Sequence, residues 1–201
     1  MRIRNLKNAK DIINNSDLIV SEYHKIFDND NPIHLEIGMG KGDFLLESAL
    51  RNPNINYIGV ERYDTIVAKA LEKIEPFHLN NIKIIKCDAK EVGDIINKEI
   101  DILYLNFFDP WPKKKHHKRR LTHPIFLNIY DKLFKADKVI ILKTDNIELF
   151  DYSIEMLKEY GYKIEEISRD LENSNIPNIK TEYERKFIAK GIKINYLKVR
   201  K

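Results

Sequence analysis

The sequence predicts an α/β fold of the Rossmann-like type, with a doubly wound, mostly parallel seven-stranded sheet and an antiparallel C-terminal hairpin. Three observations carry this prediction. Short runs rich in Ile and Val alternate with amphipathic helical segments about every 20–25 residues. A glycine-rich loop directly follows the first strong strand run. The last two strand runs have no helix pattern between them, which indicates that they pair in antiparallel fashion.

Each element follows from its local pattern. The expected strands are 33–37, 55–60, 82–87, 102–107 and 139–142, followed by the late strands 162–168 and 185–199 with a turn at Gly191. The expected helices are 43–51, 63–74, 92–96, 124–134 and 147–160. In the first helix the apolar stripe is expected to consist of Phe44, Leu45, Ala49 and Leu50. Pro76 is expected to end the second helix, and Gly161 is expected to cap the last one.

The chain length and composition are those of one globular domain. The 201 residues are 43% hydrophobic and 33% charged. We expect a single domain over 32–201, preceded by an N-terminal arm or short helix over 1–31. There is no apolar run long enough to cross a membrane and no signal-peptide pattern, so a cytoplasmic location is expected. The single cysteine, Cys87, argues against a disulfide and against a multi-cysteine metal site. We therefore expect no metal. The expected oligomeric state is a monomer or a homodimer.

Positive charge is concentrated in one segment. The stretch 113–120 reads KKKHHKRR and contains six of the 35 Lys and Arg residues. Without those six, 29 basic residues face 31 acidic ones, so this stretch accounts for all of the excess positive charge. Such a run forms either a solvated loop or a contact with phosphates. Its concentration on an otherwise slightly acidic chain favours nucleic acid.

Acidic side chains occur at the ends of four successive strands, namely Glu36, Glu61, Asp88 and Asp109. In open α/β sheets, ligands bind at the carboxyl ends of the strands. Between the first acid and the next helix lies a loop with glycines at alternate positions, Gly38, Gly40 and Gly42. The glycines allow the backbone to approach a ligand closely. The four acids and the loop together predict a small-molecule site at that edge.

The acids around the loop favour a cationic ligand over a dinucleotide. Glu36 precedes the first glycine and Asp43 follows the third, so a pyrophosphate would be repelled. S-adenosyl-L-methionine has an ammonium, a sulfonium and no phosphate, and it suits this loop. Glu61 is placed to accept from the ribose hydroxyls and Asp88 from the adenine amino group. Two structural alternatives remain: Glu36 fixes the loop, and Asp88 is only a turn residue.

A stiff loop follows the fourth expected strand. Its sequence, Asn-Phe-Phe-Asp-Pro-Trp-Pro at 106–112, holds a carboxylate and an indole between two prolines. Such a loop can present a hydrogen-bond acceptor and an aromatic surface to a flat base. The alternative is a rigid turn with Trp111 packed in the core.

These segments together resemble the bacterial tRNA (guanine-N7)-methyltransferases, a family of class I S-adenosylmethionine-dependent enzymes. The resemblance covers nearly all of the chain from residue 33 onward. The segments that carry it are LEIGMGKGDFL at 35–45, YIGVE at 57–61, the strand end at Asp88, NFFDPWPKKKHHKRR at 106–120, LKTDN at 142–146 and TEYERKFIAKG at 181–191.

The resemblance implies a role for each matching position. Asp109 matches the residue with the catalytic role. The cofactor-binding residues implied with it are Glu36, Gly38, Gly40, Glu61, Asp88 and Asp109 itself. The implied tRNA contacts are Lys113, Lys115, His116, His117, Lys118, Arg119, Arg120, Asp145, Thr181, Glu182, Tyr183 and Glu184. The family's target is guanine 46 in the variable loop of tRNA.

Local alternatives remain for two of these segments. Thr181 to Glu184 has the spacing of a helix capping box, but the residues after it alternate as a strand, which favours the substrate role. Residues 144–146 have the composition of an N-cap for the helix that follows. Other functions also stay open: an adenine-N6 methyltransferase, an NAD-dependent oxidoreductase and a non-catalytic RNA-binding module.

Overall fold

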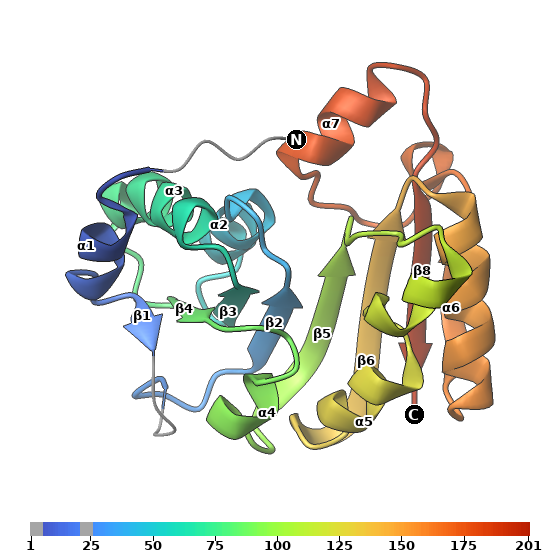
Figure 1. Cartoon of the computed structure of the whole chain (residues 1–201), viewed down its shortest axis with the longest axis horizontal. Helices are drawn as coiled ribbons and strands as arrows, with labels where there is room; N and C mark the ends of the chain where they lie inside the picture. Colours follow the sequence, from blue (N-terminus) through green and yellow to red (C-terminus); the bar gives the residue numbers. More distant parts are fainter. Residues whose placement is uncertain (1–5, 21–25) are drawn as a thin grey trace. The chain divides into compact units, whose positions relative to one another are not determined.

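The computed structural model describes residues 6–20 and 26–201 (Figure 1). The chain divides into two compact units, Met1–Ile96 and Asn97–Lys201. Part of the expected N-terminal arm, at 1–5 and 21–25, lies outside the described residues. The described part of that segment contains a short helix, α1 (Ala9–Asn14), and a two-residue strand, β1 (Ile19–Val20). The expected single domain over 32–201 stays a prediction.

The first unit contains a parallel four-stranded arrangement in the order β1-β4-β3-β2. Its three main strands are β2 (Ile33–Ile37), β3 (Asn56–Glu61) and β4 (Ile82–Lys86). They match the expected strands to within one residue at each end. The edge strand β1 was not expected, and it raises the number of strands among the described residues from seven to eight.

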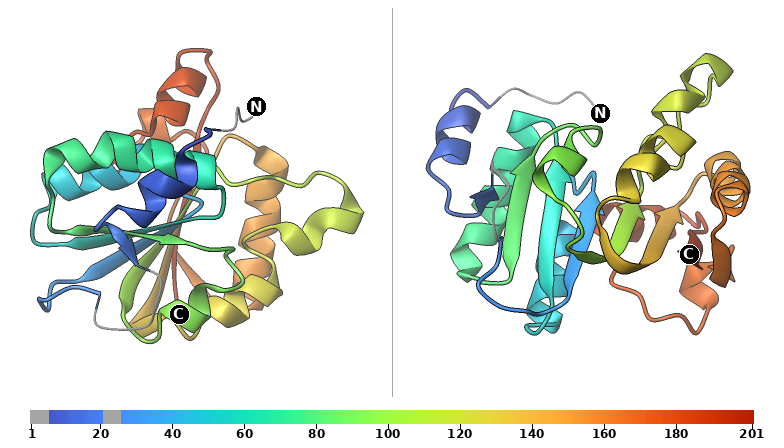
Figure 2. Two further views of the ribbon diagram at one scale, coloured as in Figure 1. Left: turned by 60° about the vertical axis from the view of Figure 1, so that its left-hand side comes forward. Right: turned by 90° about the horizontal axis from the view of Figure 1, so that it is seen from below.

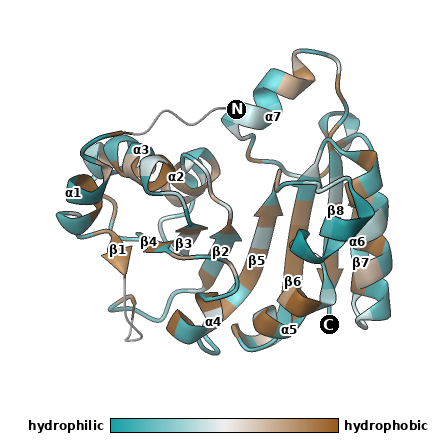
Figure 3. Cartoon of the chain, in the orientation of Figure 1, coloured by the Kyte–Doolittle hydropathy of each residue, from teal (hydrophilic) through white to brown (hydrophobic). Residues whose placement is uncertain are grey.

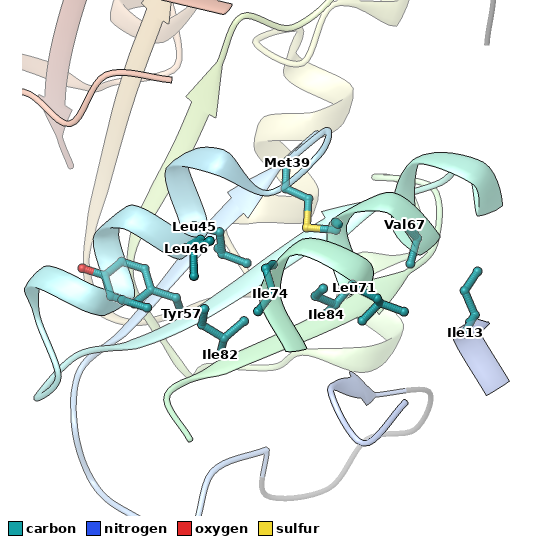
Figure 4. Close-up of a cluster of buried hydrophobic side chains, with 12 residues drawn as sticks. Ile13, Met39, Leu45, Leu46, Tyr57, Val67, Leu71, Ile74, Ile82 and Ile84 are labelled. Carbon is teal, nitrogen blue, oxygen red and sulfur yellow. The ribbon is translucent and has the colours of Figure 1, made fainter. Parts of the chain in front are cut away.

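Two amphipathic helices form the apolar core of this unit together with the strands. They are α2 (Asp43–Arg51) and α3 (Asp64–Ile74), which runs on into a 3-10 turn, η1 (Glu75–Phe77). Figure 4 shows Leu45 and Leu46 of α2 near Tyr57 and Ile82. The expected stripe of α2 was wrong at one position: Leu50 is 45% exposed, while Leu46 is buried in its place. A short helix, α4 (Val92–Ile95), ends the unit.

The second unit combines a parallel and an antiparallel pairing in the order β5-β6-β8-β7. Strands β5 (Ile100–Asn106) and β6 (Phe134–Thr144) are parallel. Strand β8 (Asn195–Arg200) runs antiparallel to β6 and to its other neighbour, β7 (Lys163–Ser168). The antiparallel C-terminal pair is therefore confirmed. Figure 2 shows these strands and the helices of the unit from two further directions.

The helices of the second unit agree with the expected ones except at two places. Helix α6 (Ile147–Glu159) matches, and the Gly161 N–H donates to Lys158 O at 3.0 Å with φ of +97°, as its capping role requires. Helix α5 (Pro124–Tyr130) ends earlier than expected because Phe134 already pairs with Ile100 as the start of β6. Two 3-10 turns complete the unit, η2 (Lys114–Arg119) and η3 (Leu171–Asn173).

The second discrepancy concerns residues 182–188, which form a helix, α7 (Glu182–Ile188), and not the expected strand. Thr181 Oγ1 accepts from the Glu184 N–H at 2.9 Å, so Thr181 caps a real helix and the prediction that no helix was available was wrong. Phe187 and Ile188 of this helix pack on the buried cluster of Leu171, Ile194 and Tyr196.

Hydropathy follows this arrangement along the chain. In Figure 3 the interior strands carry mostly apolar residues, while the helices alternate between apolar and polar residues. No helix in the described part of the chain is both long and apolar enough to cross a membrane.

Candidate functional site

The glycine loop of the first unit forms as the sequence predicts. Gly38, Gly40 and Gly42 all have positive φ, at +78°, +57° and +73°, a conformation that residues with a Cβ adopt only under strain. The N–H groups of Gly38 and Met39 donate to Val60 O at 2.9 and 3.1 Å, which ties the loop to β3. A Cβ on Gly38 or Gly40 would meet no atom within 4 Å, so these two positions have open space around them.

Glu61 joins the end of β3 to this loop. Its carboxylate accepts from the backbone N–H groups of Arg62 at 2.8 Å and Tyr63 at 3.1 Å, and also from that of Gly40. Burial raises the pKa of Glu61, and these backbone donors and the nearby Arg62 charge partly offset the rise. Glu61 is therefore held in a fixed orientation beside the glycines.

Asp88 follows β4 and combines the expected turn role with an ion pair. Its Oδ1 accepts from the Lys90 N–H at 3.1 Å, while Oδ2 lies 3.4 Å from Arg62 Nη1. Arg62 also stacks over the Tyr63 ring, with its guanidinium carbon 4.5 Å from the ring centroid. Arg62 was not among the residues predicted from the sequence. Its position directly after Glu61 was the signal that would have found it.

The other two residues of interest in this unit lie deeper. Glu36, at the C-terminal part of β2, is only 3% exposed. Cys87 is buried, and burial with help from Glu91 and Asp88 raises the pKa of its thiol to about 12. The thiol therefore stays protonated at neutral pH, as is usual for a buried cysteine in apolar surroundings.

In the second unit, strained backbone presents Asp109 to solvent. Phe107 and Trp111, on either side of Asp109, have φ of +51° and +42°, which is unusual for residues with a Cβ. Such strain persists only where surrounding contacts impose it, and it clusters at functional sites. Phe108 is buried, whereas Asp109 is exposed. The loop therefore holds its carboxylate outward from a fixed base.

Arg120 supplies contacts that hold this loop. Its Nε donates to Pro110 O at 2.8 Å and its Nη2 reaches Trp111 O at 3.4 Å. Its guanidinium carbon also lies 4.4 Å from the centroid of the Tyr152 ring. With 3% exposure, Arg120 is directed into the protein although it belongs to the basic run. The structure thus gives it an anchoring position, and not an open position on the surface.

The rest of the basic run lies on the turn η2 and faces outward. Lys113, Lys114, Lys115, Lys118 and Arg119 are exposed, and no carboxylate of the described residues pairs with any of them. His116 and His117 are half-buried, with ring contacts to Trp111 and Tyr152 respectively. Arg119 lies over the Trp111 ring at 4.8 Å, so one face of the indole is already covered.

In the segments 144–146 and 181–184, some side chains are buried or cap a helix, while others are exposed to solvent. Asn146 is the N-cap of α6, with Oδ1 accepting from the Leu149 N–H at 2.8 Å, so the cap does not require Asp145. Thr181 and Glu184 are buried. Tyr183 is exposed, and burial of part of its ring, together with the charge of Asp145, raises the pKa of its hydroxyl.

Within each unit, the structure therefore brings together a group of the predicted residues. The glycine loop, Glu61 and Asp88 belong to the first unit. Asp109, the basic run, Asp145 and Tyr183 belong to the second. No group of three or more His, Cys, Asp or Glu side chains in the described ranges has the geometry to hold a metal ion.

A family model described as "Putative methyltransferase" (Methyltransf_4) matches residues 30–197. Full-length relatives carry the name tRNA (guanine-N(7)-)-methyltransferase. The protein from Alkaliphilus oremlandii is 46% identical over 95% of this chain and 95% of its own length. The protein from Listeria monocytogenes serovar 1/2a is 45% identical over 100% of this chain and 98% of its own.

Solved structures confirm the fold at much lower identity. An antibiotic-related methyltransferase aligns with a TM-score of 0.63 at 18% identity, covering 100% of this chain and 96% of its own. Precorrin-6y C5,15-methyltransferase from Geobacter metallireducens aligns with a TM-score of 0.59 at 15% identity, covering 86% and 82%. The Rossmann-like class I methyltransferase fold predicted from the sequence is therefore correct.

The anchoring position of Arg120 predicts the effect of its removal. Arg120→Ala leaves the partly buried carbonyl groups of Pro110 and Trp111 without their charged donor, so the free energy of unfolding should fall by about 2 kcal/mol. Trp111, the only tryptophan, should become more exposed, and its fluorescence emission should shift to the red. Denaturant titration and emission spectra measure both effects.

Lys114→Ala is the matched control for this measurement. It removes an exposed cation of the same segment, which pairs with no carboxylate in the described part of the chain, and neither stability nor emission should change. An Arg120→Ala protein with unchanged stability and emission would contradict the anchoring role.

Proposed function

The chain belongs to the methyltransferase family Methyltransf_4, and on that premise we propose that it transfers a methyl group from S-adenosylmethionine to N7 of a guanine in tRNA. The observation that carries this proposal is the nearly full-length match to relatives named tRNA (guanine-N(7)-)-methyltransferase. The tRNA substrate comes to this chain from the name of those relatives. The S-adenosylmethionine donor is predicted from the strand-end acids and fits the methyltransferase family and fold. The arrangement of the candidate residues in each unit supports the same chemistry.

The first unit suits the methyl donor. The open space at Gly38 and Gly40 admits a ligand close to the backbone, and Glu61 is held beside it by three backbone donors. A carboxylate so placed accepts hydrogen bonds from the two ribose hydroxyls. Asp88 is proposed to accept from the adenine amino group, and Glu36 to favour the cationic methionine end. When bound, S-adenosylmethionine supplies an electrophilic methyl group on a sulfonium.

The second unit suits the guanine. Guanine N7 has an in-plane lone pair and no proton, so its attack on the methyl carbon requires no general base. Placement of the base is then the main task, and orientation of this kind contributes about 7–11 kcal/mol in favourable systems. Asp109 is proposed to accept from the N1–H and the N2 amino group of guanine. Adenine lacks that pair of donors and is therefore rejected.

The basic run is proposed to hold the tRNA backbone. Lys113, Lys115, Lys118 and Arg119 expose unpaired cations, with His116 and His117 beside them. A guanine in the tRNA core must be exposed before it reacts, as in enzymes that flip bases out of a stack. The cytoplasmic location predicted from the sequence is part of this proposal.

Incubation with labelled S-adenosylmethionine and bulk tRNA, followed by nucleoside analysis, tests the proposal. The expected product is 7-methylguanosine. Label in N6-methyladenosine would favour the adenine-N6 alternative, and tRNA binding without any product would favour the non-catalytic module.

Asp109→Ala and Asp109→Asn test the assigned catalytic role. Both variants lose at least one of two acceptors for guanine, so turnover should fall at least about a hundredfold because a misplaced base reacts slowly. Binding of tRNA, measured by filter retention, should survive since the exposed cations are untouched. Retained turnover in either variant would refute the role of Asp109.

Replacing Lys115, Lys118 and Arg119 together with Ala should weaken tRNA binding. Loss of three phosphate contacts should lower the slope of log affinity against log salt by about 2–3. Cofactor affinity, measured by calorimetry, should stay the same. The control triple, Lys135→Ala with Lys158→Ala and Lys163→Ala, removes equal charge from other exposed positions of the unit. Equal losses in both triples would argue against a localised contact.

The raised pKa of Glu61 predicts that cofactor binding depends on pH. Ribose binding requires the carboxylate, and protonation sets in at a higher pH than for an ordinary glutamate. Affinity for S-adenosylmethionine should therefore fall as the pH is lowered through that raised pKa. Glu61→Gln should bind weakly at neutral pH with a flatter profile, while Glu47→Gln on the exposed face of α2 should keep the wild-type profile. A wild-type profile in Glu61→Gln would exclude the assignment.

A further inference from the structure

Lys143 is a buried lysine that the function described above does not use. It lies one residue before the end of β6 and is 2% exposed. Its Nζ donates to Glu184 Oε2 at 2.8 Å, to Asn178 Oδ1 at 3.0 Å and to Ile179 O at 2.9 Å. A lysine ammonium has three N–H donors, so these three acceptors use all of them.

Glu184 is held equally firmly by its surroundings. Its side chain is fully buried, and its second carboxylate oxygen accepts from Asn178 Nδ2. Its backbone N–H donates to the capping hydroxyl of Thr181. The carboxylate thus faces the protein interior, and a direct contact with tRNA would require breaking a buried ion pair, which is strongly unfavourable.

The neighbouring residue Tyr183 faces the opposite way. It is 44% exposed, and its ring centroid lies 5.0 Å from that of Phe107 and 4.2 Å from that of Phe187, on which it stacks. An exposed aromatic ring with a packed support is a surface on which an unstacked base can lie.

The backbone of Lys143 completes a connection between three segments. Its carbonyl accepts from the Phe107 N–H at 2.9 Å, at the strained start of the loop that carries Asp109. Asp145 follows two residues later in the chain. Lys143 therefore links the Asp109 loop, the end of β6 and the segment 178–184 in one hydrogen-bonded network, with the Lys143–Glu184 ion pair buried at its centre.

We propose that Lys143 is a positioning residue for methyl transfer, which holds Glu184 so that Tyr183 is presented to the guanine base of the tRNA. Glu184 acts through this ion pair and does not touch the substrate. A pair of apolar residues would pack as well here, but it would not fix the position of the segment, because only the ion pair requires one arrangement of donors and acceptors. This inference rests on the proposed function.

A double-mutant cycle between Lys143→Met and Tyr183→Ala tests the coupling. Each single variant should lower kcat at least tenfold, while the Kd values for tRNA and S-adenosylmethionine change less than threefold. The double variant should be no more than threefold slower than Tyr183→Ala, because Lys143 acts through Tyr183. The proposal would be overturned if the loss of kcat in the double variant equalled the product of the two single losses. It would also be overturned if the kcat of Lys143→Met lay within twofold of wild type.

The control is Lys138→Met, which removes another lysine of β6 that pairs with Asp131 at 2.8 Å. Its kcat should stay within twofold of wild type. If Lys143→Met does not fold, Lys143→Arg takes its place in the same cycle, since it keeps the charge but changes the donor geometry.

Hydrogen exchange separates this proposal from the proposed function. Exchange of the backbone amides in 178–188 should be faster in Lys143→Met, with no change over 33–61. A wild-type protein that methylates no tRNA would refute the proposed function alone. Unchanged exchange in 178–188 would refute the anchoring by Lys143, whatever the activity.

Discussion

Parallel strand pairing is the constraint on which the candidate residues depend. When parallel strands pair, their carboxyl ends emerge at the same edge, and this holds for β2, β3 and β4 in one unit and for β5 and β6 in the other. Glu36 pairs with Gly59 and Glu61 with Lys86, and this strand register fixes how far along its strand each carboxylate lies. The loop beginning at Gly38 bonds to Val60, and Glu61 can then reach the Gly40 N–H.

The ion pair between Arg62 and Asp88 is weak enough for a ligand to take the place of Arg62. Both side chains are well exposed, at 45% and 38%, and their closest atoms lie 3.4 Å apart. An exposed pair of this kind contributes about 0–1 kcal/mol, so a ligand donor can replace Arg62 on Asp88 at little cost. Glu61, whose partners are the backbone N–H groups of Arg62, Tyr63 and Gly40, keeps its orientation whether or not the side chain of Arg62 moves.

Burial divides the cations of the second unit into two kinds. Arg120 and Lys143 direct their charges to carbonyl oxygens and a carboxylate inside the protein, where each fixes a segment of the proposed substrate site. Lys115, Lys118 and Arg119 lie on the surface, available for phosphates. Arg119 and Arg120 are adjacent in the chain, yet Arg120 is buried and bonds to the loop backbone, whereas Arg119 is exposed and lies over the Trp111 ring.

The sequence alone determined the order of the main strands and helices, the glycine loop and the strand-end acids, because local periodicity and glycine spacing are properties of short segments. It also indicated the family, since its motifs are contiguous. Only the tertiary structure decided that 182–188 is a helix, that Glu184 and Arg120 face inward, and that Arg62 and Lys143 matter. The two ion pairs join residues that are distant in the chain, Lys143 with Glu184 and Arg62 with Asp88, and local patterns contain no information about such partners.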